Sequence, residues 1–441
     1  METIHLFVAN HALVVSAAIL LIAYFFIATE KIPKATVALV GAALTIILGL
    51  VSQSKGHGVI HPHYFANFID FNVIFLLVSM MIIVHITAKS GIFNWLANEI
   101  LKRTKGHPIQ ILIALGVFTA IASAFLDNVT TVILLLPITF VIAEKLDIDP
   151  IPFLMTEIFA SNIGGTATLI GDPPNIIIGS KAGFSFMDFI QELTGIVAII
   201  MIVTLCFLIL FFRKRLKTSP EKMAAVAELD NSQTITDKKL MFRSLFILSF
   251  VIMGFVLHDF LHLDSYIIAM LGASLLLLFE KPNQIFADVE WNTIFFFIGL
   301  FIIIGGFEAS GGIKLMAQWL LELTQGNQLN TSMIILWASG LLSGFIDNIP
   351  YTATMAPMIY EIQEVQGIAY AHPLWWCLSL GACLGGNATI IGAAANVIVS
   401  ETAAKSGHPI SFMRFLKYGL FIMTLSLFLS SFYIYFRFLA H

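Results

Sequence analysis

Long apolar runs follow one another along almost the whole sequence, and they constrain the fold more than any other feature. Of the 441 residues, 58% are hydrophobic and 11% are charged. About 20 apolar residues in an α-helix cross the hydrocarbon core of a bilayer. Because backbone groups in hydrocarbon must be hydrogen-bonded within the protein, the runs predict an all-α polytopic membrane protein. The predicted unbroken spans are residues 12–28, 33–51, 73–87, 189–212, 245–261, 266–279, 291–306 and 415–436.

Two further runs contain residues that cannot continue a lipid-facing helix. Residues 153–180 include the stretch NIGGTATLIGDPPN, which starts at Asn162 and ends at Asn175. Its glycine and proline pairs break the helix and leave carbonyl groups unpaired. Each unpaired carbonyl costs several kcal/mol in hydrocarbon unless protein or water donates a hydrogen bond to it. Residues 373–402 carry the related stretch LGGNATIIGAAAN, which ends at Asn396. We therefore predict two discontinuous helices that line a cavity, as in the binding sites of secondary transporters.

Two other segments, residues 108–143 and 331–361, are apolar but have a polar interruption near the middle. The interruptions are Asp127-Asn128 and Asp347-Asn348. Each limb is somewhat short for a full crossing. We therefore predict two re-entrant helical hairpins, which enter and leave on one side and place their tips beside the broken helices. The alternative is two full crossings with a tight turn at the far surface.

The segments occur in the same order in both halves, and several match in sequence. DFNVIFLL from Asp70 resembles EWNTIFFF from Glu290. Each half then has five crossings and one hairpin. Because five is odd, the second copy is inserted upside down, which predicts the inverted repeats found in secondary transporters. The predicted division is a first repeat at 1–212, a linker at 213–241 and a second repeat at 242–441.

The placement of lysine and arginine predicts the orientation. With the amino terminus outside, inward segments hold Lys31, Lys34, Lys89, Lys102, Arg103, Lys105, Lys145, the basic linker, Lys281, Lys405, Arg414 and Lys417. Outward segments hold Lys55, Lys181, Lys314 and Arg437. The positive-inside rule then makes the linker cytoplasmic. A compact chain without a targeting sequence fits a bacterial inner membrane, and the net charge of −4 suggests no nucleic-acid partner.

The aspartates at the two hairpin tips are the first candidates for function. An aspartate at the centre of a membrane helix costs about 2.5–3.5 kcal/mol, so two of them are expected to have a role. Each could bind Na⁺ with neighbouring oxygens or take a proton. The predicted Na⁺ ligands are Asp127, Asn128, Asp347 and Asn348. The alternative is that each carboxylate only caps the helix that follows it.

Hydroxyl, amide and backbone groups around the tips and breaks are expected to complete the site. They belong to Thr130, Thr131, Asn162, Gly165, Thr166, Thr168, Asn175, Thr352, Asn387, Thr389 and Asn396. Serine and threonine in membrane helices often bond to their own backbone instead. Asp172 is also a candidate, although the second half has Ala393 there. Asp172 is either a turn residue of the Gly-Asp-Pro-Pro bend or a proton or cation group used by one half only.

These motifs resemble the ion transporter superfamily, in the branch of arsenite permeases, D-type sodium/proton antiporters and the melanosomal P protein, which have a citrate-transporter-like domain. The resemblance covers nearly the whole chain. It rests on FLDNVTTVILLLP (125–137), NIGGTATLIGDPPN (162–175), FIDNIPYTATMAP (345–357) and LGGNATIIGAAANV (384–397). It implies a homodimer in which a scaffold holds a moving transport domain, called an elevator.

Dicarboxylate/sodium symporters are similar more distantly. Their resemblance implies a Ser-Asn-Thr signature at the hairpin tips, where this chain has Asp127-Asn128 and Asp347-Asn348. A negative carboxylate would repel a dianion unless a proton or Na⁺ neutralised it. The departure therefore argues against a dicarboxylate substrate.

Together these features predict a secondary active ion transporter and not an enzyme. It would work by alternating access in the lipid bilayer, with Na⁺ or H⁺ as coupling ion and no other cofactor, and Na⁺/H⁺ antiport is the leading form. The alternative is a permease coupled to Na⁺ or H⁺ for a small anion, such as an arsenite-type oxyanion, chloride or a carboxylate, bound at glycine-rich half-helix starts. More remote are a passive channel and an intramembrane protease with an aspartate dyad.

Overall fold

The structure is a computed structural model that describes residues 8, 10–29, 31–51, 64–227 and 234–440. Its regular elements are helices, and nine of them are long and apolar enough to cross a membrane within this part of the chain. The nine are α2 (Ala12–Thr29), α4 (Phe71–Lys89), α6 (Pro108–Phe125), α7 (Asn128–Leu146), α10 (Phe186–Phe212), α12 (Lys238–Val256), α16 (Trp291–Ala309), α18 (Gln328–Ile346) and Phe412–Leu439. The predicted all-α polytopic membrane protein is confirmed.

Shorter helices complete the spans. They are α3 (Lys34–Ile47) and α14 (Ser265–Leu277), which are apolar, with α13 (His258–Leu261), α15 (Pro282–Ala287) and the 3₁₀ helix η1 (Tyr64–Phe68) in the connections. The last span divides into α22 (Phe412–Ile434) and the π-helical η3 (Tyr435–Leu439).

Both predicted breaks are present. The first separates α8 (Ile151–Gly165) from α9 (Pro173–Ala182), and the second separates α20 (Ile368–Gly385) from η2 (Ile390–Gly392) and α21 (Ala394–Lys405). Every residue of α8 is buried inside the protein. The broken backbone therefore lies among other helices and not against lipid, as its unpaired carbonyls require.

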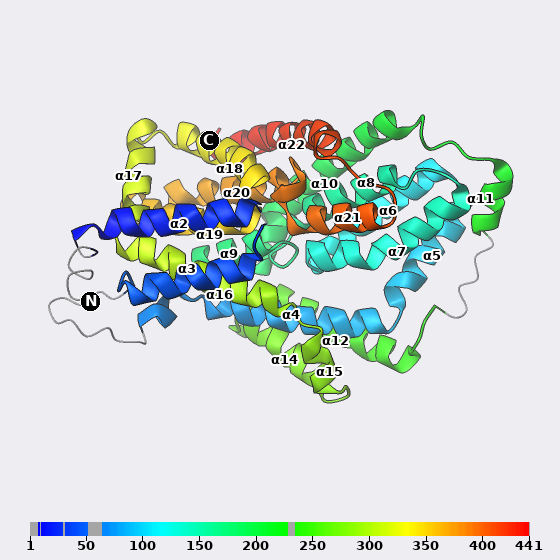
Figure 1. Ribbon diagram of the computed structural model, residues 1–441, viewed down its shortest axis with the longest axis horizontal. Coiled ribbons are helices and arrows are strands. Elements are labelled where there is room, and N and C mark those ends of the chain that lie inside the picture. The colour runs from blue at the N-terminus through cyan, green and yellow to red at the C-terminus, as the bar shows by residue number, and fades with distance from the viewer. Residues whose placement is uncertain (1–7, 9, 30, 52–63, 228–233, 441) are drawn as a thin grey trace.

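Two helical hairpins also form as predicted, α6–α7 and α18–α19 (Asn348–Gln366). Their limbs have 18 or 19 residues, about 27–29 Å. The expectation that each limb is somewhat short for a full crossing was therefore wrong for α6, α7 and α18, which are long and apolar enough to cross a membrane. Figure 1 shows α6–α7 toward the right of the molecule and α18–α19 toward the left, with their turns near the middle. The tips thus end inside the molecule. An inverted relation between whole halves stays a prediction.

The helices pack in two groups. The α3–α16 group consists of α2, α3, α4, α12, α14 and α16, and the hairpin group consists of both hairpins, both broken helices, α10 and α22. In the α3–α16 group the backbones approach closely, because a Cβ on Gly299 would lie 2.6 Å from the carbonyl carbon of Ala38. In Figure 1, α4, α12 and α14 lie along the lower edge and α18, α20 and α22 along the upper edge.

Two amphipathic helices that the sequence analysis did not predict connect the groups. Helix α5 (Ile92–Arg103) joins α4 to the first hairpin, and α17 (Gly312–Leu323) joins α16 to the second. Each follows a glycine in the left-handed region, Gly91 at φ +82° and Gly311 at φ +84°. Side chains rarely adopt this conformation, so glycine permits the sharp turn at both corners.

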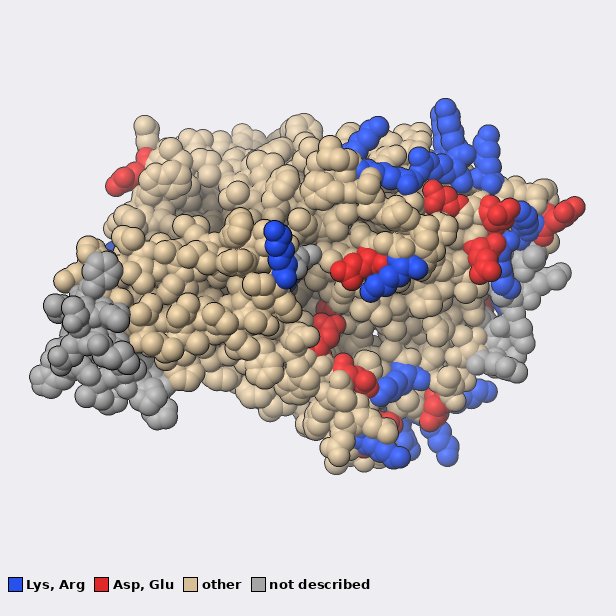
Figure 2. Space-filling model, viewed as in Figure 1, with Lys and Arg blue, Asp and Glu red and all other residues tan. Residues whose placement is uncertain are grey.

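The linker packs against the first hairpin. Its helix α11 (Pro220–Ala227) places Lys222 on Asp147, and the Lys222 ammonium lowers the pKa of that carboxyl. The Thr218 hydroxyl donates to the Leu146 carbonyl at 2.6 Å. Figure 2 shows lysine and arginine gathered toward this end of the visible face. Residues 1–7 and 228–233 lie outside the described residues, and the orientation stays a prediction.

Candidate functional site

One buried carboxylate lies between the tips of both hairpins. Asp172, the last residue of the first break, is fully buried. The Asn128 amide nitrogen lies 3.4 Å from Oδ1 of Asp172. The Asn348 amide nitrogen lies 3.3 Å from Oδ1 and 3.2 Å from Oδ2. Because Asn128 begins α7 and Asn348 begins α19, Asp172 joins both hairpins to the broken helix α8–α9.

Asn162 extends this cluster to the second broken helix. Its amide nitrogen donates to Oδ1 of Asn387 and to Oδ1 of Asn396, both at 3.0 Å. Its own oxygen accepts from Asn128 at 3.3 Å. The Nδ2 atom of Asn387 is buried without a hydrogen-bond partner among the described residues. Amide side chains therefore connect the two breaks across more than two hundred residues of sequence.

Two asparagines donate hydrogen bonds to carbonyl groups that the helix breaks leave without a helical partner. The Asn175 amide nitrogen donates to the carbonyls of Thr166 at 3.1 Å and Thr168 at 2.8 Å. The Asn396 amide nitrogen donates to the carbonyls of Gly386 at 2.7 Å and Thr389 at 2.8 Å. These bonds satisfy buried backbone carbonyls, which would cost free energy if they were left without a hydrogen-bond partner. They give both asparagines a structural reason to be present.

Hydroxyl groups tie each break to the neighbouring hairpin. Thr168 Oγ1 donates to the Ala124 carbonyl, and Thr389 Oγ1 donates to the Gly344 carbonyl. The glycine pairs allow the close approach, because a Cβ on Gly164 would lie 2.1 Å from the carbonyl oxygen of Ala120. Gly165 packs against the break itself, where a Cβ would lie 2.6 Å from the carbonyl oxygen of Gly171.

Some of the remaining threonines bond to their own backbone, and others have hydroxyl groups that can take part in the site. Thr130 contacts the Asp127 carboxylate through its amide at 2.9 Å and its hydroxyl at 2.5 Å. Thr131 and Thr166 donate to carbonyls four residues earlier, at 2.9 and 2.8 Å, as helix threonines often do. Thr352 Oγ1 is buried without a partner among the described residues. Among the candidate threonines of the two tips and breaks, Thr352 therefore has a hydroxyl that the described residues leave available to a ligand.

The two apical aspartates, which sequence alone makes equivalent, differ in their contacts. Asp127 caps α7 through Thr130 and forms no ion pair with a basic side chain within the described part of the chain. Asp347 caps α19 at 3.1 Å through the Ile349 amide and also accepts from Lys34 Nζ at 2.6 Å. Its φ of +93° is rare for a residue with a side chain and is strained. An ammonium group thus already neutralises the second tip.

Sequence reasoning missed several residues at the site. It counted Lys34 among the loop cations, although a lysine in the first turn of an apolar helix can reach inward. It also missed Tyr24, whose hydroxyl donates to the Pro350 carbonyl at 2.5 Å, and Ser379, whose hydroxyl donates to Asn175 Oδ1 at 2.6 Å. Glu157 was detectable as the one carboxyl in the run from 151 to 163.

Ionisable residues inside membrane helices mark transport pathways, and broken helices at mid-depth form the binding sites of transporters. A buried carboxylate between two hairpin tips and two broken helices, in an all-helical membrane protein, therefore defines a membrane transporter and not an enzyme. Residues 24–381 match the family model described as Citrate transporter, and the chain belongs to this family.

Relatives with similar sequences include one that is named as a membrane protein. The 46 kDa membrane protein of Mycobacterium leprae is 40% identical over 430 residues, which cover 97% of this chain and 99% of that protein. The P protein of Mus musculus is 31% identical over 491 residues, which cover 93% of this chain and 58% of the P protein. The resemblance noted from the motifs is thus confirmed.

A solved structure supports the fold. The YdaH transporter of Alcanivorax borkumensis, whose structure is described as having an unusual topology, superposes with a TM-score of 0.57 at 13% sequence identity. The superposition covers 91% of this chain and 96% of that chain. At this identity the likeness shows the fold alone.

Proposed function

We propose that this transporter couples alternating access to Na⁺ or H⁺, with Na⁺/H⁺ antiport as the leading form. The observation that carries the proposal is Asp172, a fully buried carboxylate that the Asn128 and Asn348 amide nitrogens contact at 3.2–3.4 Å. An ionised carboxylate in such surroundings is costly, so it is expected to bind either a proton or a cation.

The same three side chains suit either ion. With the amide nitrogens turned toward Asp172, the two asparagines donate to the carboxylate. A half-turn of each amide brings its oxygen to the same place, and three oxygen-bearing side chains then face a common point. A hard cation such as Na⁺ prefers such oxygen ligands. Asp127, with its threonine hydroxyl and no basic partner, is the second cation position in this proposal.

Movement of the hairpin group against the α3–α16 group would alternate access. The groups are joined in sequence by α5, by α17 and by the linker between α10 and α12, and a few polar contacts bridge them. These are Lys34 on Asp347 at 2.6 Å, Tyr24 on Pro350 at 2.5 Å, and the Ser180 hydroxyl on Asp70 at 2.5 Å. An elevator motion would break and re-form these contacts while both tips and both breaks moved together. The homodimer implied by the resemblance belongs to the same proposal.

The alternative is a cation-coupled anion permease, and one feature favours it. Helix α21 starts with Ala394-Ala395, whose backbone amides are available to an anion at a helix start. Helix α9 differs, because it starts with Pro173-Pro174, which have no amide hydrogens, directly after the Asp172 carboxylate. An anion would therefore bind at the second break, with a coupling cation at Asp172.

Charge favours the cation form over a large anion. The two tips and the first break carry three carboxylates, Asp127, Asp172 and Asp347, and the ammonium of Lys34 compensates one of them. A multiply charged anion such as citrate, which the family description names, would be repelled until cations or protons neutralised the other two.

Transport in proteoliposomes tests the proposal. With a pH-sensitive dye inside, an inward Na⁺ gradient is expected to make the lumen alkaline, because entering Na⁺ drives H⁺ out. Asp172→Asn, which keeps shape and removes the charge, is expected to abolish the response. Asp288→Asn is the control, because Asp288 forms an exposed ion pair with Lys89, whose ammonium lowers the pKa of the Asp288 carboxyl. This variant is expected to leave the pH response intact.

The same vesicles separate the alternatives. Labelled chloride, arsenite or citrate that accumulates only under an imposed Na⁺ or H⁺ gradient would support the permease. Flux that runs downhill and cannot be driven uphill by either gradient would indicate a channel. An Asp172→Asn protein that transports like wild type with unchanged ion coupling would refute the assignment of the central site.

A further inference from the structure

Glu157 is a buried carboxyl that lies outside the cluster around Asp172. It stands in the middle of α8 with an exposed fraction of 0%. One oxygen, Oε1, accepts a hydrogen bond from the Thr139 hydroxyl of α7. The other, Oε2, is buried and has no hydrogen-bond partner among the described residues. Half of this carboxyl is therefore unsatisfied.

Charged groups on the neighbouring helices do not neutralise Glu157. Helices α6, α7, α10, α20, α21 and α22 pack on α8. Their acidic, basic and histidine side chains are Glu144 and Lys145 on α7, Asp188 and Glu192 on α10, His372 on α20, Glu401 and Lys405 on α21, and Arg414, Lys417 and Arg437 at α22 and η3. Each of these is partly or fully exposed, and none forms an ion pair or hydrogen bond with Glu157 within the described residues.

Neither protonation state of Glu157 is fully satisfied. The ionised form lacks a positive partner in a dry interior, where an isolated charge is strongly disfavoured. In the neutral form, a proton on Oε2 would need an acceptor, and the described residues supply none there. The donor of Oε1 lies at a weak place in α7, because Pro137 removes one backbone hydrogen bond two residues before Thr139. A small local rearrangement can therefore decide which state is occupied.

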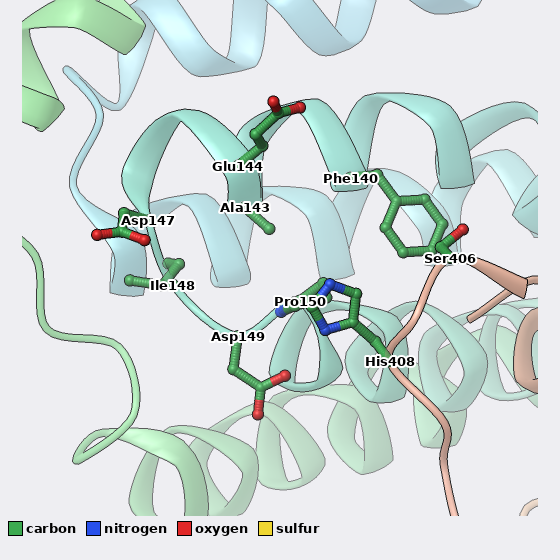
Figure 3. Close-up of a pocket in the computed structure, with 9 residues that line it drawn as sticks. All are labelled: Phe140, Ala143, Glu144, Asp147, Ile148, Asp149, Pro150, Ser406 and His408. Atoms are coloured by element: carbon green, nitrogen blue, oxygen red, sulfur yellow. The ribbon is translucent and has the colours of Figure 1, made fainter. Parts of the chain in front are cut away.

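A cavity of about 630 Å³ lies at the end of the molecule where the linker packs, beside the turn between α7 and α8. Figure 3 shows its lining, which comes from α7, the α7–α8 turn and the segment after α21. Ala143 in this lining is about one turn of α7 from Thr139, and Pro150 is about two turns of α8 from Glu157. The cavity thus lies at the ends of the two helices that carry Thr139 and Glu157, one to two helical turns from the pair.

Four ionisable side chains lie in the lining of the cavity. It contains the side chains of Glu144, Asp147, Asp149 and His408. Asp149 lies 3.7 Å from Arg215 and 3.5 Å from Arg414, so its carboxylate is held in place.

We propose that Glu157 is a proton-binding site that exchanges with water through this cavity. On loading, Oε2 of the carboxylate gains a proton from water in the cavity. On release the proton returns to water, and the Thr139 hydroxyl then stabilises the carboxylate by donating to Oε1. Glu157 lies five residues, about 7.5 Å of helix, before Asn162. The same rigid helix therefore connects its protonation to the amide cluster.

Infrared difference spectroscopy on the full-length protein in lipid measures the proposed proton directly. A protonated carboxylic acid has a carbonyl stretching band that an ionised carboxylate lacks, and deuterium exchange shifts it. The wild-type protein is expected to lose such a band as the pH rises. Glu157→Gln is expected to remove the band from the difference spectrum, whereas Glu144→Gln, a matched change in the cavity lining, is expected to keep it.

Thr139→Val provides a second variant that leaves the carboxyl in place. Because it removes a donor that favours the ionised form, the midpoint of the band change is expected to move to higher pH by about one unit, a tenfold increase in proton affinity. The proposal is overturned if the spectrum of Glu157→Gln matches wild type. A band assigned to Glu157 that persists unchanged across the accessible pH range would equally overturn it, because the acid would then be permanently neutral.

The measurement does not depend on the proposed transport. Asp172→Asn, which is expected to stop ion coupling, should retain the Glu157 band. If the Glu157 band is absent while the Na⁺-driven pH change is intact, the Glu157 proposal fails and the transport proposal survives. The two proposals are thus tested in separate assays.

Discussion

Replacing Lys34 by methionine removes the basic partner of Asp347 and keeps a side chain of similar length. The two groups are 2.6 Å apart, and their side chains are 24% and 2% exposed, respectively. Removing one member of a buried pair costs about 3–5 kcal/mol, because an uncompensated charge remains. Since Lys34 is partly exposed, the expected loss of stability is at the lower end, about 3 kcal/mol.

Thermal unfolding with a thiol-reactive dye measures this loss. Cys377 and Cys383 are buried in α20 and react when the hairpin group opens. Cys206 is exposed and is first replaced by alanine. An unfolding entropy of about 2.1 cal/mol/K per residue gives about 0.9 kcal/mol/K for this chain, so Tm is expected to fall by about 3 °C. Adding Asp347→Asn is expected to restore most of it, because the unpaired charge disappears.

Lys31 supplies the matched control for this experiment. It lies in the connection between α2 and α3, three residues before Lys34, and its side chain is exposed. Lys31→Met is expected to leave Tm unchanged. The reasoning is refuted if Lys34→Met melts like Lys31→Met, or if the effects of Lys34→Met and Asp347→Asn simply add. Either result would show that the Lys34–Asp347 contact does not stabilise the packing of the α3–α16 group against the hairpin group.

Two further substitutions test how the breaks are held. Asn162→Ala removes three side-chain hydrogen bonds, to Asn128, Asn387 and Asn396, and is expected to cost about 2–4 kcal/mol by the same assay; a change below 1 kcal/mol would contradict a role for this amide in joining the breaks. Gly164→Ala would bring a Cβ to 2.1 Å from the Ala120 carbonyl oxygen and is expected to destabilise by at least about 1–3 kcal/mol. Gly195→Ala is its control, because no atom lies within 4 Å, and it is expected to be neutral or to stabilise α10 by about 0.5–1 kcal/mol. Equal melting of the two alanine variants would show that close backbone packing does not explain the glycine.

Sequence alone predicted the elements that hydrocarbon constrains locally. Long apolar runs, prolines and paired glycines determine where a membrane helix can form and where it must break, since each backbone group needs a nearby partner. The spans, both breaks and both hairpins were therefore predictable. The connecting helices α5 and α17 were not, because their residues are apolar on one face only and do not form a wholly apolar run.

The tertiary structure alone decided how the polar residues are used. The repeat made Asp127 and Asp347 look equivalent, whereas Lys34, 313 residues away, pairs with only one of them. Asp172 looked like a turn residue or a group of one half, and contacts from both hairpins place it at the centre. Sequence thus determined where the chain crosses and breaks, because those rules act within one turn or one segment. Partners for buried charges come from distant segments, and only packing brings them together.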